Sequence, residues 1–224
     1  MHWDSETVWA ALHLPRLKTD RLIRNGRAPE DRPLAVYAKQ ANAFVLTGVD
    51  ARAAALNLRP GMALADARAM YPRIAIADAD LEADRRLLIA IADWCDRYTP
   101  LVGLDPPDGL MLDITGCAHL FGGEEALRRD ITARLGGQGF QACAAVADTV
   151  GCAWAVARYG SALRVPSDQM REALLPLPLA ALRIAPETVT DLAQVGLKRI
   201  ADAIDRPRAP LAARFGEDFL RRLD

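Results

Sequence analysis

Short apolar runs broken by turn residues dominate the first third of the chain. Three of these runs predict buried strands, namely Thr7–Leu14, Leu34–Ala38 and Ala43–Thr47, and Pro15 ends the first. Between and after them, the pattern predicts short helices over Leu17–Arg24, Ala51–Leu58 and Leu64–Met70. Asp50 suits the N-cap of the second helix, and Pro60-Gly61 ends it. Residues 20–75 are therefore expected to form a compact unit of two strands and two short helices.

The middle of the chain alternates longer helices with strands. Leu88, Ile91, Cys95 and Tyr98 recur at helical spacing and predict an amphipathic helix over Leu81–Tyr98. A hairpin of strands Pro100–Leu104 and Leu110–Thr115 follows, and then come a helix, a strand and a helix over Glu124–Leu135, Gln141–Ala147 and Thr149–Arg158. With Thr7–Leu14 as the first strand, the order is β-α-β-β-α-β, which is the ferredoxin-like arrangement. The 20–75 unit is an insertion after its first strand.

Beyond Pro166 the strand pattern stops and only short helices are predicted. Ser167 suits the cap of a helix that ends near Leu175, before Pro176 and Pro178. Further helical segments are Pro186–Val195, Lys198–Ile204, Pro210–Phe215 and Glu217–Leu223. The chain therefore combines an α+β region with a small all-α region at its C-terminus.

Composition excludes several broad classes. About half of the 224 residues are hydrophobic, which favours a sizeable core over disorder, and the formal net charge of −1 gives no global argument for nucleic acid or membrane. No apolar run approaches the roughly 18 residues of a membrane span, and the acidic start MHWDSETVW differs from a signal peptide. Four cysteines without CxxC spacing favour reduced thiols over a metal site. We expect a cytoplasmic protein.

The hairpin between Tyr98 and Gly123 holds the candidate chemistry. Its turn, Asp105-Pro106-Pro107-Asp108-Gly109, is rich in residues that favour tight turns. Asp108 is a candidate metal ligand or only a turn residue. Asp113 lies inside an apolar strand, and strand alternation points it away from Asp108, which favours a structural hydrogen-bond acceptor.

Three segments resemble the Y-family (translesion) DNA polymerases. MLDITG followed by LFGG resembles their palm, GVDARAAALNLRPGM their fingers, and RIAPETVTDLAQVGLKRIADAI their helix-hairpin-helix thumb. The segments WAALHLPRLKTDRLIR, PGMALADARAMYP and DGLMLDITGCAHLFGGE resemble the ImuB branch in particular. The resemblance implies a palm over residues 1–19 and 76–164, fingers over 20–75 and a thumb over 165–224. It also implies a fragment that lacks the C-terminal little-finger domain.

The same resemblance implies a degenerate catalytic site. Family members hold two metal ions with a strand-1 Asp and an Asp-Glu pair at the hairpin apex, and two-metal chemistry depends on such carboxylates. By alignment with these motifs, Pro15 and Leu17 stand at the two acidic positions of the first strand. Asp108 is retained, whereas Gly109 replaces the Glu. We therefore expect no catalytic residue, no Mg²⁺ site and no other cofactor.

Contacts to the incoming nucleotide and to DNA are also reduced in this comparison. Arg52 matches the arginine that grips the triphosphate, but Val49 replaces its tyrosine partner. Arg52 is thus a remnant of nucleotide binding or an ordinary solvated arginine. The family's lysines fall near Val150 and Trp154, and Asp20 stands at the aromatic gate. In the thumb, Ala185-Pro186-Glu187 replaces a glycine-rich phosphate-binding hairpin, and proline has no N–H to donate.

The resemblance predicts a non-catalytic scaffold that serves translesion synthesis after DNA damage. The implied partners are a RecA-like protein of the ImuA type, a replicative-type error-prone polymerase, and the sliding clamp through a segment outside this chain. Contact with DNA is weak in this reading, and no membrane is involved. Two alternatives are an active Y-family polymerase with altered metal ligands and a protein-binding module without a DNA role.

Overall fold

A computed structural model describes residues 7–29, 31–161 and 163–224, so residues 1–6 of the predicted palm lie outside the described part. A five-stranded sheet forms its centre, in the order β5-β6-β1-β7-β8. Its strands are β1 (Trp9–His13), β5 (Val102–Asp105), β6 (Gly109–Asp113), β7 (Cys143–Ala147) and β8 (Arg164–Val165). β1 runs antiparallel to both β6 and β7. The first four strands have the predicted ferredoxin-like order, and β8 is an addition that the sequence did not indicate.

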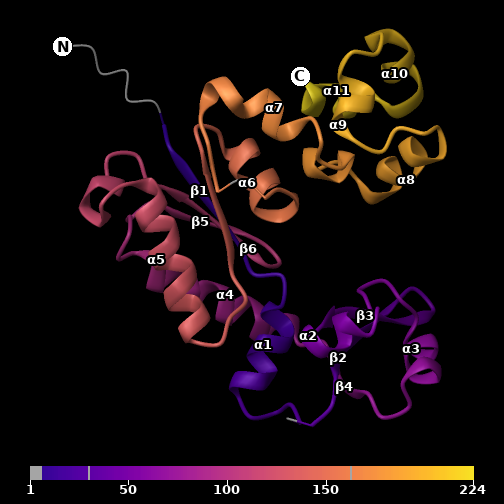
Figure 1. Ribbon diagram of the computed structural model, residues 1–224. Helices are drawn as coiled ribbons and strands as arrows, with labels where there is room; N and C mark the ends of the chain where they lie inside the picture. Colours follow the sequence, from indigo (N-terminus) through magenta and orange to yellow (C-terminus); the bar gives the residue numbers. More distant parts are fainter. Residues whose placement is uncertain (1–6, 30, 162) are drawn as a thin grey trace.

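The two faces of this sheet carry different helices (Figure 1). On one face, α4 (Leu81–Cys95) and α5 (Glu124–Gly137) bury residues such as Leu88, Ile91 and Leu127 against the sheet. On the other face, α6 (Val150–Tyr159) packs on Ala11, Ala145 and Ala147 of β1 and β7. Small residues on these two strands let the helix approach closely. The sheet is therefore covered on both faces, and its core divides into two clusters.

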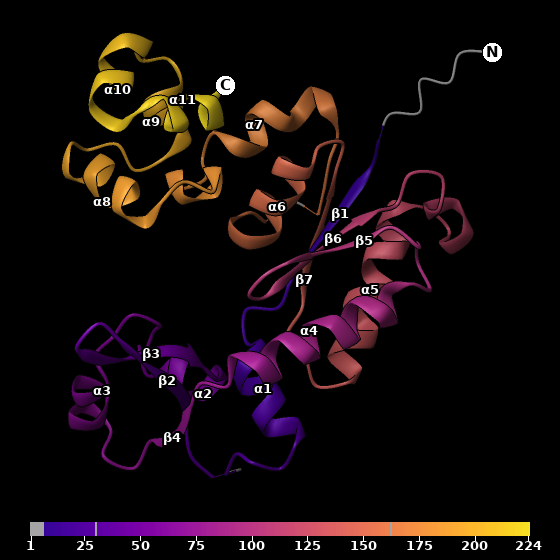
Figure 2. The ribbon, with the colours of Figure 1, turned by 180° about the vertical axis from the view of Figure 1, so that it is seen from behind.

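A second, smaller sheet has the order β3-β2-β4 and is built from β2 (Leu34–Gln40), β3 (Ala43–Val49) and β4 (Ala75–Asp78). Helices α2 (Ala51–Ala55) and α3 (Leu64–Met70) complete this unit. β4 was not predicted; it pairs in parallel with β2, about 40 positions upstream, and local periodicity cannot show such a distant pairing. Helix α1 (Leu17–Arg24) lies between this unit and α4 (Figure 2).

The C-terminal region is helical, as predicted. It contains α7 (Met170–Leu174), α8 (Pro186–Gln194), α9 (Ile200–Ile204), α10 (Arg208–Phe215) and α11 (Glu217–Leu223), with 3-10 turns at Ser167–Gln169 and Leu179–Leu182. Leu192, Phe219 and Leu223 join the same core as α6. Ser167 is not the expected helix cap: its hydroxyl and its backbone N–H both donate to Asp148, at 2.7 Å. That carboxylate holds the start of this region on the end of β7.

Several predicted boundaries shift by a few residues. The helix expected over Leu81–Tyr98 ends at Cys95, and the helix expected over Ala51–Leu58 ends at Ala55.

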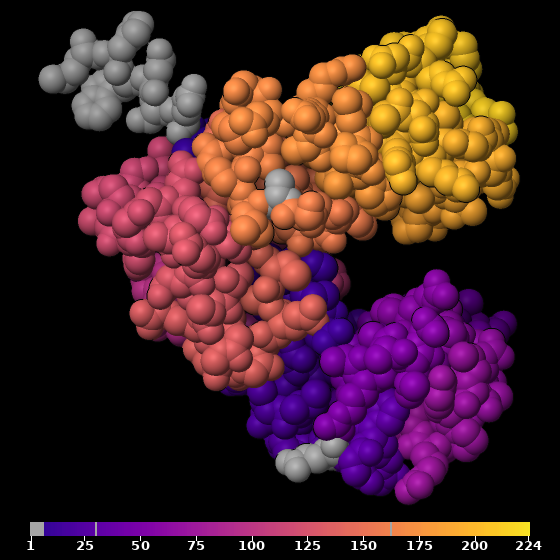
Figure 3. Space-filling view, in the orientation of Figure 1, coloured from indigo at the N-terminus to yellow at the C-terminus, as the bar shows by residue number. Residues whose placement is uncertain are grey.

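The C-terminal helices and the small sheet stand apart on one side of the molecule, with an open gap between them (Figure 3). No helix among the described residues has the length and apolar character needed to cross a membrane. All four cysteines are free thiols.

Candidate functional site

The end of β1 lies beside the apex of the β5–β6 hairpin. His13 is the register partner of Gly109, and the Leu14 N–H donates to the Asp108 carbonyl oxygen at 2.8 Å. Pro15 is exposed just beyond, whereas Leu17 is buried, 2% exposed, in the core under α4 and α5. The fold therefore brings the segment of Pro15 and Leu17 close to Asp108 and Gly109, the four positions that the sequence comparison singled out.

Asp105, the last residue of β5, is the most heavily bonded carboxylate at the apex. It is buried, and Trp154 Nε1 donates to its Oδ2 at 2.6 Å. Arg158 Nη2 donates to the same oxygen at 2.9 Å, and Arg183 pairs with Oδ1. A buried carboxylate is costly unless it is paired, and these three donors satisfy it. Asp105 is therefore the anchor of a polar network between the hairpin, α6 and the C-terminal helical region.

Asp108 belongs to the same network. Its Oδ1 accepts from Arg158 Nη2 at 2.9 Å, and its Oδ2 lies 3.6 Å from His13 Nε2. Burial raises the pKa of the Asp108 carboxyl, but the contacts with His13 and Arg158 outweigh it and leave the pKa below its ordinary value. Asp108 sits in the turn, as its neighbours predicted, and a guanidinium holds it there.

A side chain at residue 109 would meet the end of the Arg158 side chain and Asp105. A Cβ at this position would lie 2.6 Å from Arg158 Nη2 and 2.9 Å from Asp105 Oδ2. Contacts this short are repulsive, so the guanidinium of Arg158 occupies the space next to residue 109. By the sequence comparison, residue 109 is where related polymerases carry a metal-binding Glu. In this structure the space beside residue 109 therefore holds a guanidinium, and residue 109 supplies no carboxylate.

Trp154 backs the two arginines. The guanidinium carbons of Arg158 and Arg183 lie 4.5 and 4.8 Å from the centre of its ring, within the range of cation–π attraction. The sequence placed Trp154 in the core, and it is buried, but its indole N–H also bonds Asp105. Sequence reasoning missed Asp105, Arg158 and Arg183 as members of the site. The only signal for them was a Trp and an Arg four positions apart on one helix.

Asp113 is separate from this network. Its Oδ1 accepts from the backbone N–H of Thr115 at 3.0 Å, and the Thr115 hydroxyl oxygen accepts from the N–H of Val8. This is the structural acceptor role that strand alternation predicted. Within the described residues, no three His, Cys, Asp or Glu side chains are grouped so that they could hold a metal ion.

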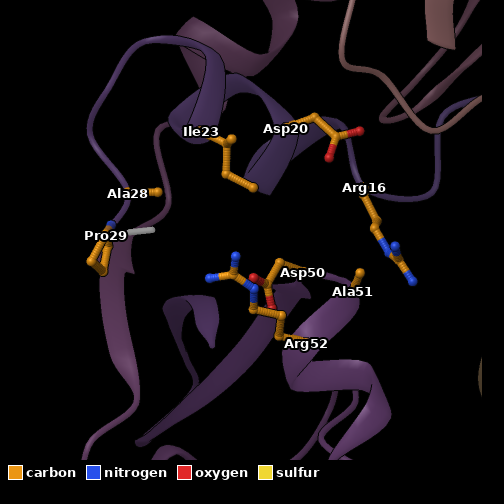
Figure 4. Close-up of a pocket in the computed structure, with 8 residues that line it drawn as sticks. All are labelled: Arg16, Asp20, Ile23, Ala28, Pro29, Asp50, Ala51 and Arg52. Atoms are coloured by element: carbon orange, nitrogen blue, oxygen red, sulfur yellow. The ribbon is translucent and has the colours of Figure 1, made fainter. Parts of the chain in front are cut away.

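A second region with candidate chemistry is a pocket of about 220 Å³ between α1 and α2 (Figure 4). Arg52 lines it from the start of α2, and Asp20 and Ile23 line it from α1, with the Asp20 carboxylate turned toward the side of Arg16. Asp50 also lines it and caps α2 by accepting from the Ala53 N–H at 2.7 Å. The pocket therefore combines Arg52 with two nearby carboxylates, which lower its attraction for phosphate.

Asp20 is fixed in that pocket. It is 7% exposed, and its Oδ2 accepts from the backbone N–H of Gln141 at 2.9 Å. Burial raises the pKa of its carboxyl, and the hydrogen bond from Gln141 opposes this shift. The position that carries an aromatic gate in related polymerases by alignment thus holds a buried acid.

In the C-terminal region, Ala185 precedes α8 and Pro186 opens it. Proline suits the first position of a helix, where its missing N–H costs nothing. The helix start therefore offers one N–H fewer to a phosphate, and Glu187 adds a negative charge in the first turn. This start of α8 is a poor phosphate-binding hairpin.

One protein family and several curated proteins match the chain. Residues 23–158 match the impB/mucB/samB family. The chain is similar to Protein ImuB of Caulobacter vibrioides, at 46% identity over 170 residues, 75% of this chain and 37% of that protein. It is also similar to DNA polymerase IV of Desulfatibacillum aliphaticivorans, at 28% identity over 229 residues, 97% of this chain and 54% of that one. The chain thus spans about a third to a half of these curated relatives.

Solved structures share its fold. The insertion ternary complex of Dbh DNA polymerase superimposes with a TM-score of 0.79 at 15% identity, covering 96% of this chain and 66% of that one. DinB from Sulfolobus solfataricus gives a TM-score of 0.75, also at 15% identity, over 96% of this chain and 65% of that one. The α+β fold class with polymerase-like architecture is therefore confirmed.

Proposed function

The chain belongs to the impB/mucB/samB family and has the fold of a Y-family DNA polymerase, and from that premise we propose that it is a non-catalytic, polymerase-like scaffold in damage-induced translesion DNA synthesis. In this proposal the protein retains the shape of a polymerase and has given up nucleotidyl transfer. Its sheet, its inserted unit and its C-terminal helices present surfaces to partner proteins and, weakly, to DNA.

One observation carries this proposal: Arg158 occupies the space beside Gly109 and pairs with both apex carboxylates. Two-metal catalysis needs carboxylates that face two divalent cations. Here the carboxylates of Asp105 and Asp108 already face one guanidinium, which cannot leave the chain. A metal ion at the apex would meet this positive charge, and residue 109 contributes no ligand to offset it. The geometry therefore supports a loss of metal binding.

The partners that we propose rest on the similarity of this chain to Protein ImuB of Caulobacter vibrioides. We propose a RecA-like protein of the ImuA type, a replicative-type error-prone polymerase, and the sliding clamp through a segment outside this chain. The formal net charge of −1 and the start of α8 at Pro186 support only weak, salt-sensitive contact with DNA.

Primer extension tests the absence of catalysis. The chain is incubated with primed DNA, all four deoxynucleotides and Mg²⁺ or Mn²⁺, and a DNA polymerase IV cut to the same three regions is the positive control. We expect no template-directed incorporation above the background of an Asp108→Ala variant. Incorporation that Asp108→Ala abolishes would establish the alternative, an active polymerase with altered ligands.

Binding to primed DNA across a salt series separates the scaffold from a module without a DNA role. We expect weak binding whose logarithm falls with the logarithm of the salt concentration. Affinity no better than that of a neutral control protein, together with tight binding to a RecA-like partner, would favour the purely protein-binding module.

A further inference from the structure

A hollow of about 460 Å³ opens on another side of α1, away from the pocket that holds Arg52. Arg16, Asp20 and Ile23 of the α1 segment line the first pocket, whereas Arg21 and Arg24 line this one. Residues separated by one turn share a face of a helix, and these two sets lie on different faces. Arg27 and Arg86 complete four arginines around the hollow, and Asp80 is the acidic residue in its lining.

Two of these arginines are held in place by the packed structure. Arg21 is buried, and its Nε donates to Asp84 Oδ1 at 2.6 Å, while its Nη2 has no hydrogen-bond partner among the described residues. The guanidinium carbon of Arg24 lies 4.2 Å from the centre of the Phe140 ring. An arginine that is already ordered loses less entropy when it binds a ligand. These contacts therefore prepare one side of the hollow.

Most negative charges near the hollow have partners, although the second oxygen of Asp84, Oδ2, has no hydrogen bond among the described residues. Asp80 caps α4 by accepting from the Ala83 N–H at 2.9 Å, and Asp84 pairs with Arg21. Glu82 lies 3.4 Å from Arg86, at an exposed and weak contact. Arg24 and Arg27 form no ion pair within the described part of the chain. The hollow therefore keeps an excess of positive charge.

Helix α4 adds to this excess because its first turn, at Asp80 and Ala83, lines the hollow. The positive end of the dipole of this 15-residue helix therefore lies at the same place as the four arginines. Guanidinium groups bind phosphate through paired hydrogen bonds, and several of them match a doubly charged group better than a single carboxylate.

We propose that this hollow is a binding site for phosphate groups, separate from the nucleotide remnant at Arg52. Its ligand is a terminal phosphate or a short polyphosphate, either free or at the end of a DNA strand. This inference does not depend on whether the chain is catalytic, because the hollow lies on another face of α1.

Calorimetric titration with tripolyphosphate at low salt tests the proposal, and neighbouring arginines of α4 provide a matched pair. Arg86 lines the hollow, whereas Arg85 is exposed on the same helix and does not line it. We expect Arg86→Gln and Arg24→Gln each to weaken binding about fivefold, and Arg85→Gln to weaken it less than twofold. All three side chains are exposed, so these variants should fold.

Competition then identifies the source of the phosphate. Displacement by a 5′-phosphorylated oligonucleotide, but not by its 5′-hydroxyl counterpart, assigns the site to a DNA end; displacement by neither oligonucleotide assigns it to free phosphates. Absence of tripolyphosphate binding overturns the proposal. An equal loss in Arg85→Gln and Arg86→Gln also overturns it, because binding would then follow general surface charge.

Discussion

The hairpin apex and the pocket between α1 and α2 correspond to two parts of one polymerase site, and they have changed in opposite ways. At the apex, Asp105 and Asp108 keep their negative charge, but Arg158 fills the space between them. In the pocket, Arg52 is retained, but Asp20 brings a carboxylate to the same lining. The apex is occupied by a guanidinium, whereas the pocket is open but lined by carboxylates, which repel phosphate.

The partners of the carboxylates differ between the two regions. Asp105 is buried at the apex, and its carboxylate and that of the partly exposed Asp108 both need a paired cation. Arg158 meets this need with a side chain that is 9% exposed. Asp20 and Asp50 in the pocket are also buried, and each accepts a backbone N–H. The apex carboxylates are therefore tied to a side chain from another helix, whereas those of the pocket are tied to backbone N–H groups.

The largest effect is expected at Asp105. Asp105→Ala leaves Arg158, Arg183 and the Trp154 indole without their shared acceptor, and it should lower the free energy of unfolding by about 3 kcal/mol. Urea denaturation measures this change. Asp113→Ala is the control, since Asp113 accepts only one local N–H, and it should cost about 1 kcal/mol. Equal losses would show that the apex network is not the anchor described above.

Gly109→Ala should cause the next largest loss of stability. The new methyl group meets Arg158 Nη2 and Asp105 Oδ2, so the free energy of unfolding should fall by about 1–3 kcal/mol. Gly103 on the neighbouring strand is the matched control, because a Cβ there has only Met111 O within reach, at 3.8 Å. Gly103→Ala should change stability by less than about 0.5 kcal/mol.

A double variant sharpens this result. In an Arg158→Ala background the shortest of these contacts is gone, whereas Asp105 Oδ2 remains 2.9 Å from the new Cβ, so adding Gly109→Ala should cost less than it does in the original chain. If the two costs simply add, Arg158 does not fill the space and the apex has room for a ligand.

The pH dependence of stability should depend on Asp108. Because the folded-state pKa of this carboxyl is lowered by His13 and Arg158 against the opposing effect of burial, the unfolded chain binds its proton more readily. Its contribution is present above the unfolded-state pKa and is lost as the pH falls through the folded-state pKa. Asp108→Asn should therefore be less stable than the original chain near neutral pH, and the difference should shrink in acid. Asp93→Asn, on the exposed face of α4, controls for the loss of one charge.

The smallest effect is expected in the open pocket. Asp20→Asn removes a negative charge from the pocket lining that Asp20 shares with Arg52, and it should strengthen binding of a nucleoside triphosphate about fivefold at low salt, measured by calorimetry without metal ions. Asp66→Asn, exposed on α3, should leave the affinity unchanged. An unchanged affinity in Asp20→Asn would mean that this carboxylate does not limit the pocket.

Much of the architecture could be predicted because hydrophobic periodicity is local. The alternation around Asp113 located β6 and gave this carboxylate its structural role, and the helical spacing from Leu88 onward located α4. The order of these elements was enough to predict the ferredoxin-like sheet.

The network at the apex could not be predicted in this way. Asp105 and Arg183 are 78 positions apart, and Asp105 and Trp154 are 49 positions apart. Turn chemistry explained Asp105 equally well as a local feature. Arg158 looked like one of many helix arginines, because nothing in its neighbours indicates that it faces Gly109. Motif comparison could identify the missing carboxylate, but only the packed structure identifies its replacement.

The central claim, that Arg158 occupies the apex in place of metal ions, is tested most directly by the binding of Mn²⁺. Electron paramagnetic resonance measures the concentration of the free ion in the presence of the chain, a nucleoside triphosphate and primed DNA. A DNA polymerase IV cut to the same regions provides the positive control. Because Arg158 occupies the apex, we expect no stoichiometric binding of Mn²⁺. The Asp108→Ala variant should therefore bind as little Mn²⁺ as the original chain. One or two tightly bound Mn²⁺ ions per chain, lost in Asp108→Ala, would show that Arg158 yields its place to metal.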